Sequence, residues 1–223
     1  MRGGEGMPRP ARRVEIVTDL MCVHGYLAFT RLMRAVRAYR EAGGEAATVF
    51  LPYQLRPDAP VAGEPLFEEH KRDRGEAFAR AVAADTTTGV ADGLELNFRR
   101  VVFTSTFDAQ LLLAAASAQG KGERTAERLF RAYYTDGLHL ADPGTLRRLA
   151  EEVGVAVTED AGERERAGER LRAELARVRG LGPPSVPAVR IDGGPFLAGE
   201  RDLSEGAFRA ALAGRPDASS ALG

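Results

Sequence analysis

The sequence predicts an α/β protein in which a small sheet is interrupted by a large all-helical insertion. Three observations predict this class. A strand, a long helix and a second strand follow one another near the N-terminus, the pattern of residues 65–180 is helical, and two short strands and a helix close the chain. The chain has 223 residues, so it is long enough to bury a sizeable hydrophobic core without disulfides.

The first unit is a strand, a helix and a strand. Residues 14–17 are a short β-branched run, which is typical of a buried strand. Over residues 23–41 the apolar side chains recur near the helical period, and Gly43 ends the helix. Residues 47–51 predict a second strand that leads into a proline-rich loop at residues 56–60. Strands joined through one helix run parallel with a right-handed connection, and we expect that arrangement here.

The middle of the chain carries helical patterns. Asp142 followed by Pro143 marks one helix start, because a polar cap residue precedes a proline at the first helical position. We expect helices at residues 67–84, 106–119, 123–135, 143–153 and 160–179. The expected insertion is therefore all-α.

After a segment rich in glycine and proline, the chain returns to strands. Residues 188–191 and 196–198 predict two strands, and Asp192-Gly193-Gly194 between them has glycine where a hairpin needs positive φ. Residues 203–212 predict the last helix. Without the helical block, the remaining β-α-β and β-β-α units have the order of a thioredoxin-like core.

These elements divide the chain into four expected parts. We expect a disordered N-terminus at 1–13, a thioredoxin-like core from 14–64 and 181–213, an inserted helical domain at 65–180, and a mobile tail at 214–223.

Composition narrows the expected partners and location. The formal charge of -1 and the pI of about 6.4 give no general attraction to nucleic acid or to an anionic membrane. The first 13 residues contain no apolar run, so they predict neither a signal peptide nor an anchor. No apolar run is long enough to cross a bilayer. With one cysteine, the chain shows no sign of an oxidising compartment, and we expect a cytoplasmic protein.

Cys22 is the only cysteine, so the chain cannot act alone as a dithiol-disulfide enzyme. It directly follows the first predicted strand and opens the first long helix, where backbone N–H groups favour an anion such as a thiolate. His24, two residues on, is a second candidate for lowering the pKa of the thiol. The alternatives are an inert buried cysteine and a histidine that faces solvent.

Val186-Pro187 precedes a predicted strand in the loop that should approach Cys22. That topology favours a cis peptide bond, although most X-Pro bonds are trans. The backbone carbonyl and N–H of Val186 would then be free to pair with an extended peptide or with a thiol cofactor.

These residues carry a resemblance to the DsbA family, and specifically to its FrnE-like branch. Five segments, in order, are similar to that branch over nearly the whole ordered chain. They are residues 14–26 around Cys22, the Tyr-Gln-Leu-Arg-Pro-Asp-Ala-Pro loop at 53–60, Thr-Ser-Thr-Phe-Asp-Ala-Gln at 104–110, Leu-Phe-Arg-Ala-Tyr-Tyr-Thr-Asp-Gly at 129–137, and Ser-Val-Pro at 185–187 followed by Ile191-Asp192-Gly193 and Gly199.

The resemblance also shows where this chain departs from the family. Family oxidoreductases have Cys-Pro-x-Cys at the helix start, whereas this chain has Cys22-Val23-His24-Gly25, so Gly25 stands at the resolving position. The position of His24 is that of a histidine which stabilises the thiolate in periplasmic members. The resemblance therefore excludes dithiol oxidation but leaves chemistry by one cysteine open.

The same superfamily contains glutathione-dependent enzymes similar to kappa-class transferases and to 2-hydroxychromene-2-carboxylate isomerase. The resemblance to them implies a low-molecular-weight thiol, such as glutathione or mycothiol, as a candidate cofactor. In those enzymes a Gly-Ser-Asp-Arg stretch holds the cofactor, but the corresponding stretch here, Gly199-Glu200-Arg201-Asp202, matches it poorly.

Five further side chains are candidate binding residues. Asp19 is a candidate proton relay or helix cap, and Tyr26 is either a hydrogen-bond donor to a substrate or a core residue. Gln54, Arg56 and Gln110 are expected to line a space between the helical insertion and the core. His70 and His139 have no spacing that makes a metal site, so we predict no metal.

The sequence leaves three functions open. The first is an enzyme in which Cys22 performs single-thiol chemistry. The second is an enzyme that isomerises or cyclises a small, aromatic or polyketide-type molecule. The third is a non-catalytic peptide-binding or chaperone-like module. Monothiol disulfide exchange with an external thiol is a further alternative.

Overall fold

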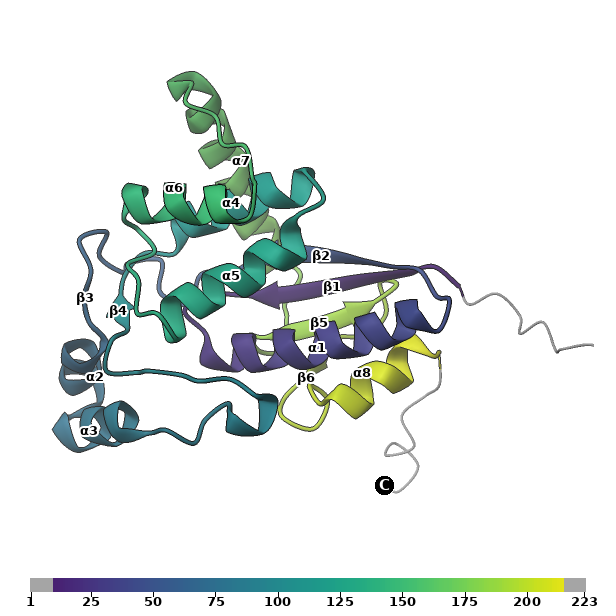
Figure 1. Cartoon of the computed structure of the whole chain (residues 1–223), viewed down its shortest axis with the longest axis horizontal. Coiled ribbons are helices and arrows are strands. Elements are labelled where there is room, and N and C mark those ends of the chain that lie inside the picture. Colours follow the sequence, from purple (N-terminus) through teal and green to yellow (C-terminus); the bar gives the residue numbers. More distant parts are fainter. Residues whose placement is uncertain (1–9, 215–223) are drawn as a thin grey trace, which may run out of the picture.

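A four-stranded mixed sheet lies at the centre of the structure, a computed structural model that describes residues 10–214 (Figure 1). The strand order is β2-β1-β5-β6, and the strands are β1 (Arg12–Thr18), β2 (Ala46–Pro52), β5 (Ala188–Ile191) and β6 (Leu197–Ala198). β1 runs parallel to β2 and antiparallel to β5. The α/β class and the parallel first pair, both predicted from the sequence, are confirmed.

The two faces of β1 bury different residues because successive side chains point to opposite sides of a strand. Val14 and Ile16 belong to the larger core cluster with residues of α1 (Val23–Glu41) and α8 (Glu205–Leu212). Val17 faces the other way, into a small cluster that includes Val178 of α7 (Ala161–Gly180). All four of these side chains are fully buried. Helices therefore cover both faces of the sheet.

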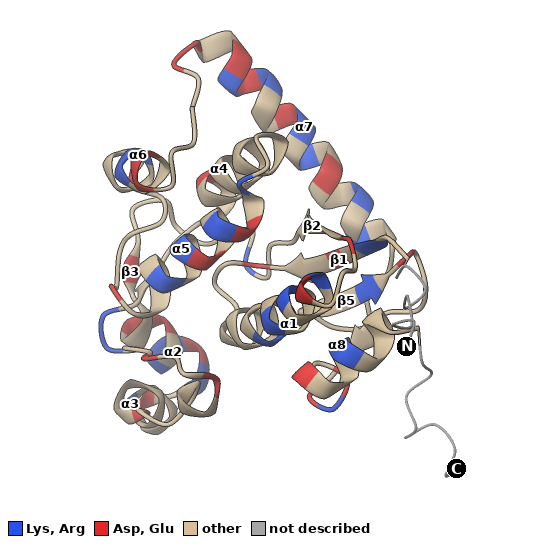
Figure 2. Ribbon diagram, turned by 45° about the vertical axis from the view of Figure 1, so that its right-hand side comes forward, with Lys and Arg blue, Asp and Glu red and all other residues tan. Residues whose placement is uncertain are grey.

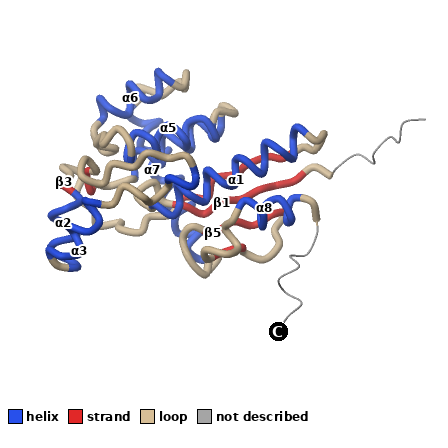
Figure 3. Tube along the Cα trace, turned by 60° about the horizontal axis from the view of Figure 1, so that its bottom comes forward, coloured by secondary structure: helices blue, strands red, loops and turns tan. Residues whose placement is uncertain are grey.

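The insertion gathers around the end of β1 at which α1 begins (Figures 1 and 3). Its elements are β3 (Glu64–Pro65), α2 (Leu66–Arg74), α3 (Glu76–Ala84), a 3-10 turn (Val90–Asp92), β4 (Val102–Phe103), α4 (Phe107–Ala118), α5 (Gly122–Tyr134), α6 (Pro143–Glu152) and α7. The predicted cap of α6 is confirmed, since the Asp142 carboxylate accepts a hydrogen bond from the Thr145 N–H at 2.7 Å.

Two predictions about the insertion are wrong. The single helix expected at 67–84 is two helices, because Gly75 adopts φ 87° and breaks the helical path between α2 and α3. The insertion is not all-α, because β3 pairs with β4 in a two-stranded antiparallel sheet. Both strands have two residues, which is too short for an alternating pattern to show in the sequence.

The expected ends of the ordered chain also need correction. Arg12 and Arg13 are not part of a disordered segment, because both lie in β1 opposite Ala46 and Ala47 of β2. The Asp192 carboxylate accepts hydrogen bonds from the Arg13 N–H and the Arg12 guanidinium, which fixes this end of the strand. The last helix begins at Glu205 rather than at residue 203, with the Ser204 hydroxyl as its cap. The remaining predictions for the two termini, at 1–9 and 215–223, lie outside the described residues.

α7 differs from the other helices in its position and its charge. Its first turns project beyond the body of the protein, and acidic and basic residues alternate along it (Figure 2). Its last turns pack on β2. None of the helices within residues 10–214 is long and apolar enough to cross a membrane.

Candidate active site at Cys22

Cys22 lies where β1 ends and α1 begins, as the sequence predicts. It is the N-cap residue of α1, and its backbone N–H donates to the Asp19 carbonyl at 3.0 Å. The side chain is only 7% exposed and makes no capping hydrogen bond. The thiol therefore faces the protein rather than solvent.

Burial raises the pKa of the Cys22 thiol to about 11, and the neighbouring Asp19 carboxylate raises it further. The backbone N–H groups of Gly25 and His24 act in the opposite direction but do not outweigh burial. The sequence predicted a lowered pKa at this helix N-terminus. In this structure that prediction is wrong, because the free-energy cost of removing a thiolate from water exceeds the stabilisation that backbone N–H groups at the helix start give it. Cys22 is therefore a neutral thiol at physiological pH.

His24 does not contribute its side chain to the site. The residue is exposed, and its imidazole makes no hydrogen bond or ion pair with the described residues. Its place in the first turn of α1 directs it to solvent, which was one of the two alternatives from the sequence. The part of His24 that reaches the thiol is its backbone N–H.

The Val186–Pro187 peptide bond is cis, and this loop does reach Cys22. The Cys22 thiol donates to the Val186 carbonyl, with 3.7 Å between sulfur and oxygen. Pro187 is buried and Val186 is half-buried. The carbonyl that the sequence predicted to be free for a peptide or a cofactor is therefore engaged by the protein's own thiol.

Gly25, at the resolving position, is closely surrounded. A Cβ added there would lie nearer to the Thr18 hydroxyl oxygen than the 3.0 Å that real Cβ contacts keep, and 3.3 Å from the Cys22 Cβ. The Thr18 hydroxyl in turn donates to the Asp19 carbonyl at 3.3 Å. The chain has thus both lost the second cysteine and filled the space that its side chain would need.

Asp19 is completely buried beside Cys22. Its carboxylate accepts hydrogen bonds from the Leu55 N–H and from the Thr106 hydroxyl, each at 2.7 Å. Burial raises the pKa of Asp19 to about 6, although these hydrogen bonds favour the charged form. The expected capping role is wrong, because Cys22 occupies the N-cap of α1 and the Asp19 side chain instead joins the core to the insertion.

Tyr26 is a core residue. It is 3% exposed, and its ring stacks on Phe130 with 5.0 Å between ring centroids and 6° between the ring planes. Burial raises the pKa of its phenol to about 12. The alternative of a substrate hydrogen-bond donor gains no support, whereas packing between α1 and α5 explains the residue.

The three other candidates divide between two places. Gln110 donates to the Tyr53 carbonyl at 3.2 Å, so it lies beside the end of β1 and β2. The backbone carbonyl of Gln54 accepts from Arg179 at 3.3 Å, and its side chain is buried. Arg56 is committed elsewhere, because its guanidinium pairs with the buried Glu69 carboxylate at 2.6 Å. Arg56 therefore fastens the loop to α2, whereas Gln110 lines a cavity between β2 of the core and helices α4 and α7 of the insertion.

Sequence reasoning missed three residues that shape the site, namely Thr18, Thr106 and Tyr134. The Tyr134 hydroxyl donates to the Met21 carbonyl, directly before Cys22, and burial holds the pKa of this phenol well above its usual range. Tyr134 and Thr106 lie in segments that resemble the family, so the matching motifs were a signal. Thr18 had no signal beyond its place at a strand end.

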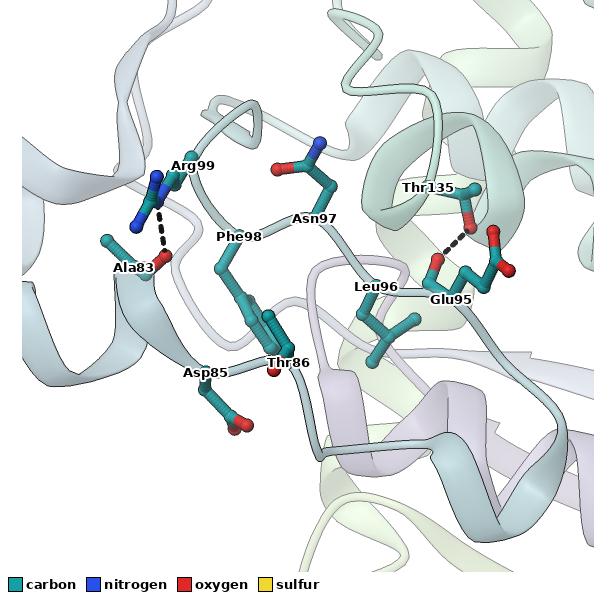
Figure 4. Close-up of a pocket in the computed structure, with 9 residues that line it drawn as sticks. All are labelled: Ala83, Asp85, Thr86, Glu95, Leu96, Asn97, Phe98, Arg99 and Thr135. Carbon is teal, nitrogen blue, oxygen red and sulfur yellow. Dashed lines mark hydrogen bonds between the residues drawn. The ribbon is translucent and has the colours of Figure 1, made fainter.

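Neither of two cavities found in the described part of the chain is lined by Cys22 or Pro187. The first holds about 500 Å³ between α3 and the segment 95–99 (Figure 4). Two of its lining side chains are already bonded within the protein, since Arg99 donates to the Ala83 carbonyl at 2.9 Å and Thr135 to the Glu95 carbonyl at 2.7 Å. The second holds about 840 Å³ beside α4 and α7. Among the described residues, no three His, Cys, Asp or Glu side chains are placed to hold a metal ion.

The fold and the site define a thioredoxin-fold protein with an inserted helical unit and one cysteine at the start of the first helix. The sequence profile of the DSBA-like thioredoxin domain matches residues 13–209, so the chain belongs to the family of DSBA-like thioredoxin domains. No curated protein matches the chain by sequence.

Solved structures agree with this assignment. A probable DsbA oxidoreductase from Streptomyces coelicolor is 25% identical, with 90% of this chain and 88% of the other covered and a TM-score of 0.74. The cytosolic disulfide reductase DsbM from Pseudomonas aeruginosa is 24% identical, with 90% and 96% covered and a TM-score of 0.57. A 2-hydroxychromene-2-carboxylate isomerase is 15% identical, with 86% and 90% covered and a TM-score of 0.57. The last two show that the fold is shared.

Proposed function

We propose that the protein is a DSBA-like enzyme that isomerises a small, aromatic or polyketide-type metabolite and uses Cys22 as a protonated thiol. The observation that carries the proposal is the state of this side chain. It is 7% exposed, its pKa is raised to about 11, and its Sγ–H donates to the Val186 carbonyl. A thiol in this state is a poor nucleophile because it keeps its proton, and its Sγ–H is a weak hydrogen-bond donor, which is the role that we assign to it.

Isomerisation fits a site with one thiol. Dithiol oxidation needs a second sulfur to accept the bond, and Gly25 supplies none. An isomerisation leaves the composition and the overall oxidation state of the molecule unchanged, so it needs no external electron acceptor, and positioned acid–base groups can promote it. Asp19 places a carboxyl group with a pKa of about 6 next to the thiol. An acid–base group works best when its pKa lies near the working pH, and a pKa of about 6 is close to neutral pH. A substrate oxygen would take the place of the Val186 carbonyl as acceptor for the Cys22 thiol.

The site does not fit a bound thiol cofactor in this conformation. The burial of Cys22 closes this position to a glutathione or mycothiol sulfur and to a substrate alike, so either ligand would have to displace the Val186 carbonyl from the thiol. Glu200 and Arg201, in the stretch that would correspond to a cofactor-holding motif, are exposed and make no hydrogen bond with the described residues. No step of the proposal therefore passes through such a cofactor.

A second candidate function is thiol exchange with an extended peptide or an external thiol. It is favoured by the contact between Cys22 and Val186, because a peptide strand that paired with the Val186 backbone would displace the thiol.

We place either activity in the cytoplasm. The lone cysteine supports that location, and DsbM, a protein of the same fold, is a cytosolic disulfide reductase.

Alkylation of native protein by iodoacetamide, followed over pH by mass spectrometry, tests the state of Cys22. We expect slow modification whose rate rises only above about pH 10, because the thiolate is scarce below the pKa of about 11. Urea-unfolded protein is the control. It should react with a midpoint near pH 8.5, because the pKa of a free cysteine thiol is about 8.5. A midpoint at or below 8.5 in the native protein would overturn the proposal in favour of thiol exchange.

Two substitutions separate the donor role from a nucleophilic one. The probe is 2-hydroxychromene-2-carboxylate, the substrate named for the isomerase of the same fold, followed by its absorbance. We expect turnover to survive in Cys22→Ser, which keeps a hydroxyl donor, and to fall about tenfold or more in Cys22→Ala. Equal loss in both variants would mean that the sulfur itself attacks, and no turnover by the unmodified protein would count against isomerisation of this class of substrate.

A further inference from the structure

The larger of these two cavities forms an open groove, and Cys22 is not among the residues that line it. We call it the α4–α7 groove, and its volume is about 840 Å³. Leu111 and Leu113 of α4, Leu171 of α7 and Phe50 of β2 form its apolar surface. A volume of this size lies within the range of about 300–1,000 Å³ that is typical of small-molecule sites.

Small side chains keep the groove open. Five alanines line it, namely Ala114, Ala115 and Ala118 of α4, Ala167 of α7 and Ala156 of the loop before α7. Leucine at these positions would fill the gap between the two helices with side-chain atoms, as in an ordinary core. Because alanine occupies them, the space remains although the helices are in contact.

The loop that forms one wall is held in place by a reciprocal clamp. The Gln119 amide donates to the Ala156 carbonyl at 2.8 Å and accepts from the Ala156 N–H at 3.0 Å. Val157, the next residue, lines the groove and is 46% exposed. The clamp fixes the backbone directly before Val157 in this wall of the groove.

The charged side chains that line the groove differ in whether they have a hydrogen-bond or ion-pair partner. Glu174 is paired with Arg177 through two hydrogen bonds of 2.7 and 2.6 Å, and Glu163 accepts from the Thr158 hydroxyl at 2.7 Å. Arg170 makes no hydrogen bond or ion pair with any residue between 10 and 214. The uncommitted charged group beside the apolar surface is therefore a cation that can donate to a carboxylate.

From these features we infer that the α4–α7 groove binds an aromatic carboxylate, with the ring system against Leu111, Leu171 and Val157 and the carboxylate on Arg170. The site is separate from Cys22 and does not depend on the proposed function. Gln110 is the residue common to both regions, since it lines the groove and donates to the Tyr53 carbonyl beside β1.

The test measures binding of 2-naphthoate to the full chain by titration calorimetry, with 2-naphthylmethanol as the neutral analogue. We expect 2-naphthoate to bind and Arg170→Gln to weaken it by about two- to fivefold, the range for a solvent-exposed ion pair. The neutral alcohol should bind Arg170→Gln and unmodified protein equally. Arg166→Gln, which changes an exposed arginine of α7 outside the lining, is the control and should change neither affinity.

A second pair of variants tests the apolar part of the groove. Ala114→Phe adds a ring from an exposed position of α4 that lines the groove, and it should weaken both ligands by about tenfold or more through steric conflict. Ala173→Phe, at an exposed position of α7 outside the lining, should weaken neither. Melting curves that match the unmodified protein show that both variants are folded.

Several outcomes would overturn the inference. They are no binding of 2-naphthoate at 1 mM, equal effects of Arg170→Gln and Arg166→Gln, or tighter binding of 2-naphthylmethylamine than of 2-naphthoate, which would mean that the acidic residues lining the groove select the ligand. Cys22→Ser should bind 2-naphthoate as the unmodified protein does, so failure of the isomerase proposal and failure of this site are distinguishable.

Discussion

The Cys22 site and the α4–α7 groove differ in how completely the protein satisfies its own groups. At the Cys22 site the thiol is bonded to Val186, the Asp19 carboxylate to Leu55 and Thr106, and Thr18 fills the space beside Gly25. In the groove, by contrast, a cation is unpaired among the described residues and an apolar side chain is exposed. The thiol and the carboxylate thus lie in a closed site. The open space for a ligand lies in the α4–α7 groove, where the sequence has mainly alanines.

The largest expected difference between the two regions is in packing. Phe130 is fully buried and stacks on Tyr26 beneath the start of α1, so Phe130→Ala should lower the free energy of unfolding by about 3–5 kcal/mol. Val157→Ala removes a half-exposed groove residue and should change it by no more than about 0.5 kcal/mol. Urea unfolding measures both. A loss below about 1 kcal/mol for Phe130→Ala would show that the Cys22 end of the core is loosely packed.

The next largest effect is the pH dependence of stability caused by Asp19. Its pKa rises from 3.8 to about 6 on folding, so only the unfolded chain is ionised between these values and stability falls as the pH rises through them. Below 3.8 there is no cost, and above about 6 the full cost is about 3 kcal/mol.

Asp19→Asn removes this titration, so its free energy of unfolding should depend less on pH between 4 and 6 than that of the unmodified protein. Asp202→Asn is the control, because Asp202 makes no hydrogen bond or ion pair with the described residues. Urea unfolding at a series of pH values measures the difference. Identical pH profiles for Asp19→Asn and the unmodified protein would mean that Asp19 is not held in the dry, buried state.

The smallest expected effect concerns Gly25→Cys, which restores the second cysteine. The new Cβ collides with the Thr18 hydroxyl, so the substitution should cost about 1–3 kcal/mol in urea unfolding and give little activity in insulin reduction. Adding Thr18→Ala removes the obstructing oxygen and should recover part of both. If the double variant is no better than Gly25→Cys alone, the Thr18 contact is not what closes the site.

Much of the fold follows from local sequence pattern. Helix α1 spans residues 23–41 as its apolar period predicts, and Asp142 caps α6 as its place before Pro143 predicts. The expected boundaries fail where one residue or a very short pairing decides the path, as at Gly75 and at the two-residue strands β3 and β4. A single residue or a two-residue strand shows no hydrophobic periodicity, because it is shorter than one helical turn and too short for an alternating strand pattern.

By itself the sequence determined that the protein has one thiol, that this thiol stands at a strand-to-helix junction, and that no dithiol cycle is available to the chain. Only the tertiary structure decided what the thiol is. Its burial depends on contacts with residues far away in the chain, such as Val186, 164 positions on, and on the Asp19 carboxylate, which Thr106 holds from 87 positions away. Desolvation depends on how completely such distant groups exclude water, and a local motif cannot encode that.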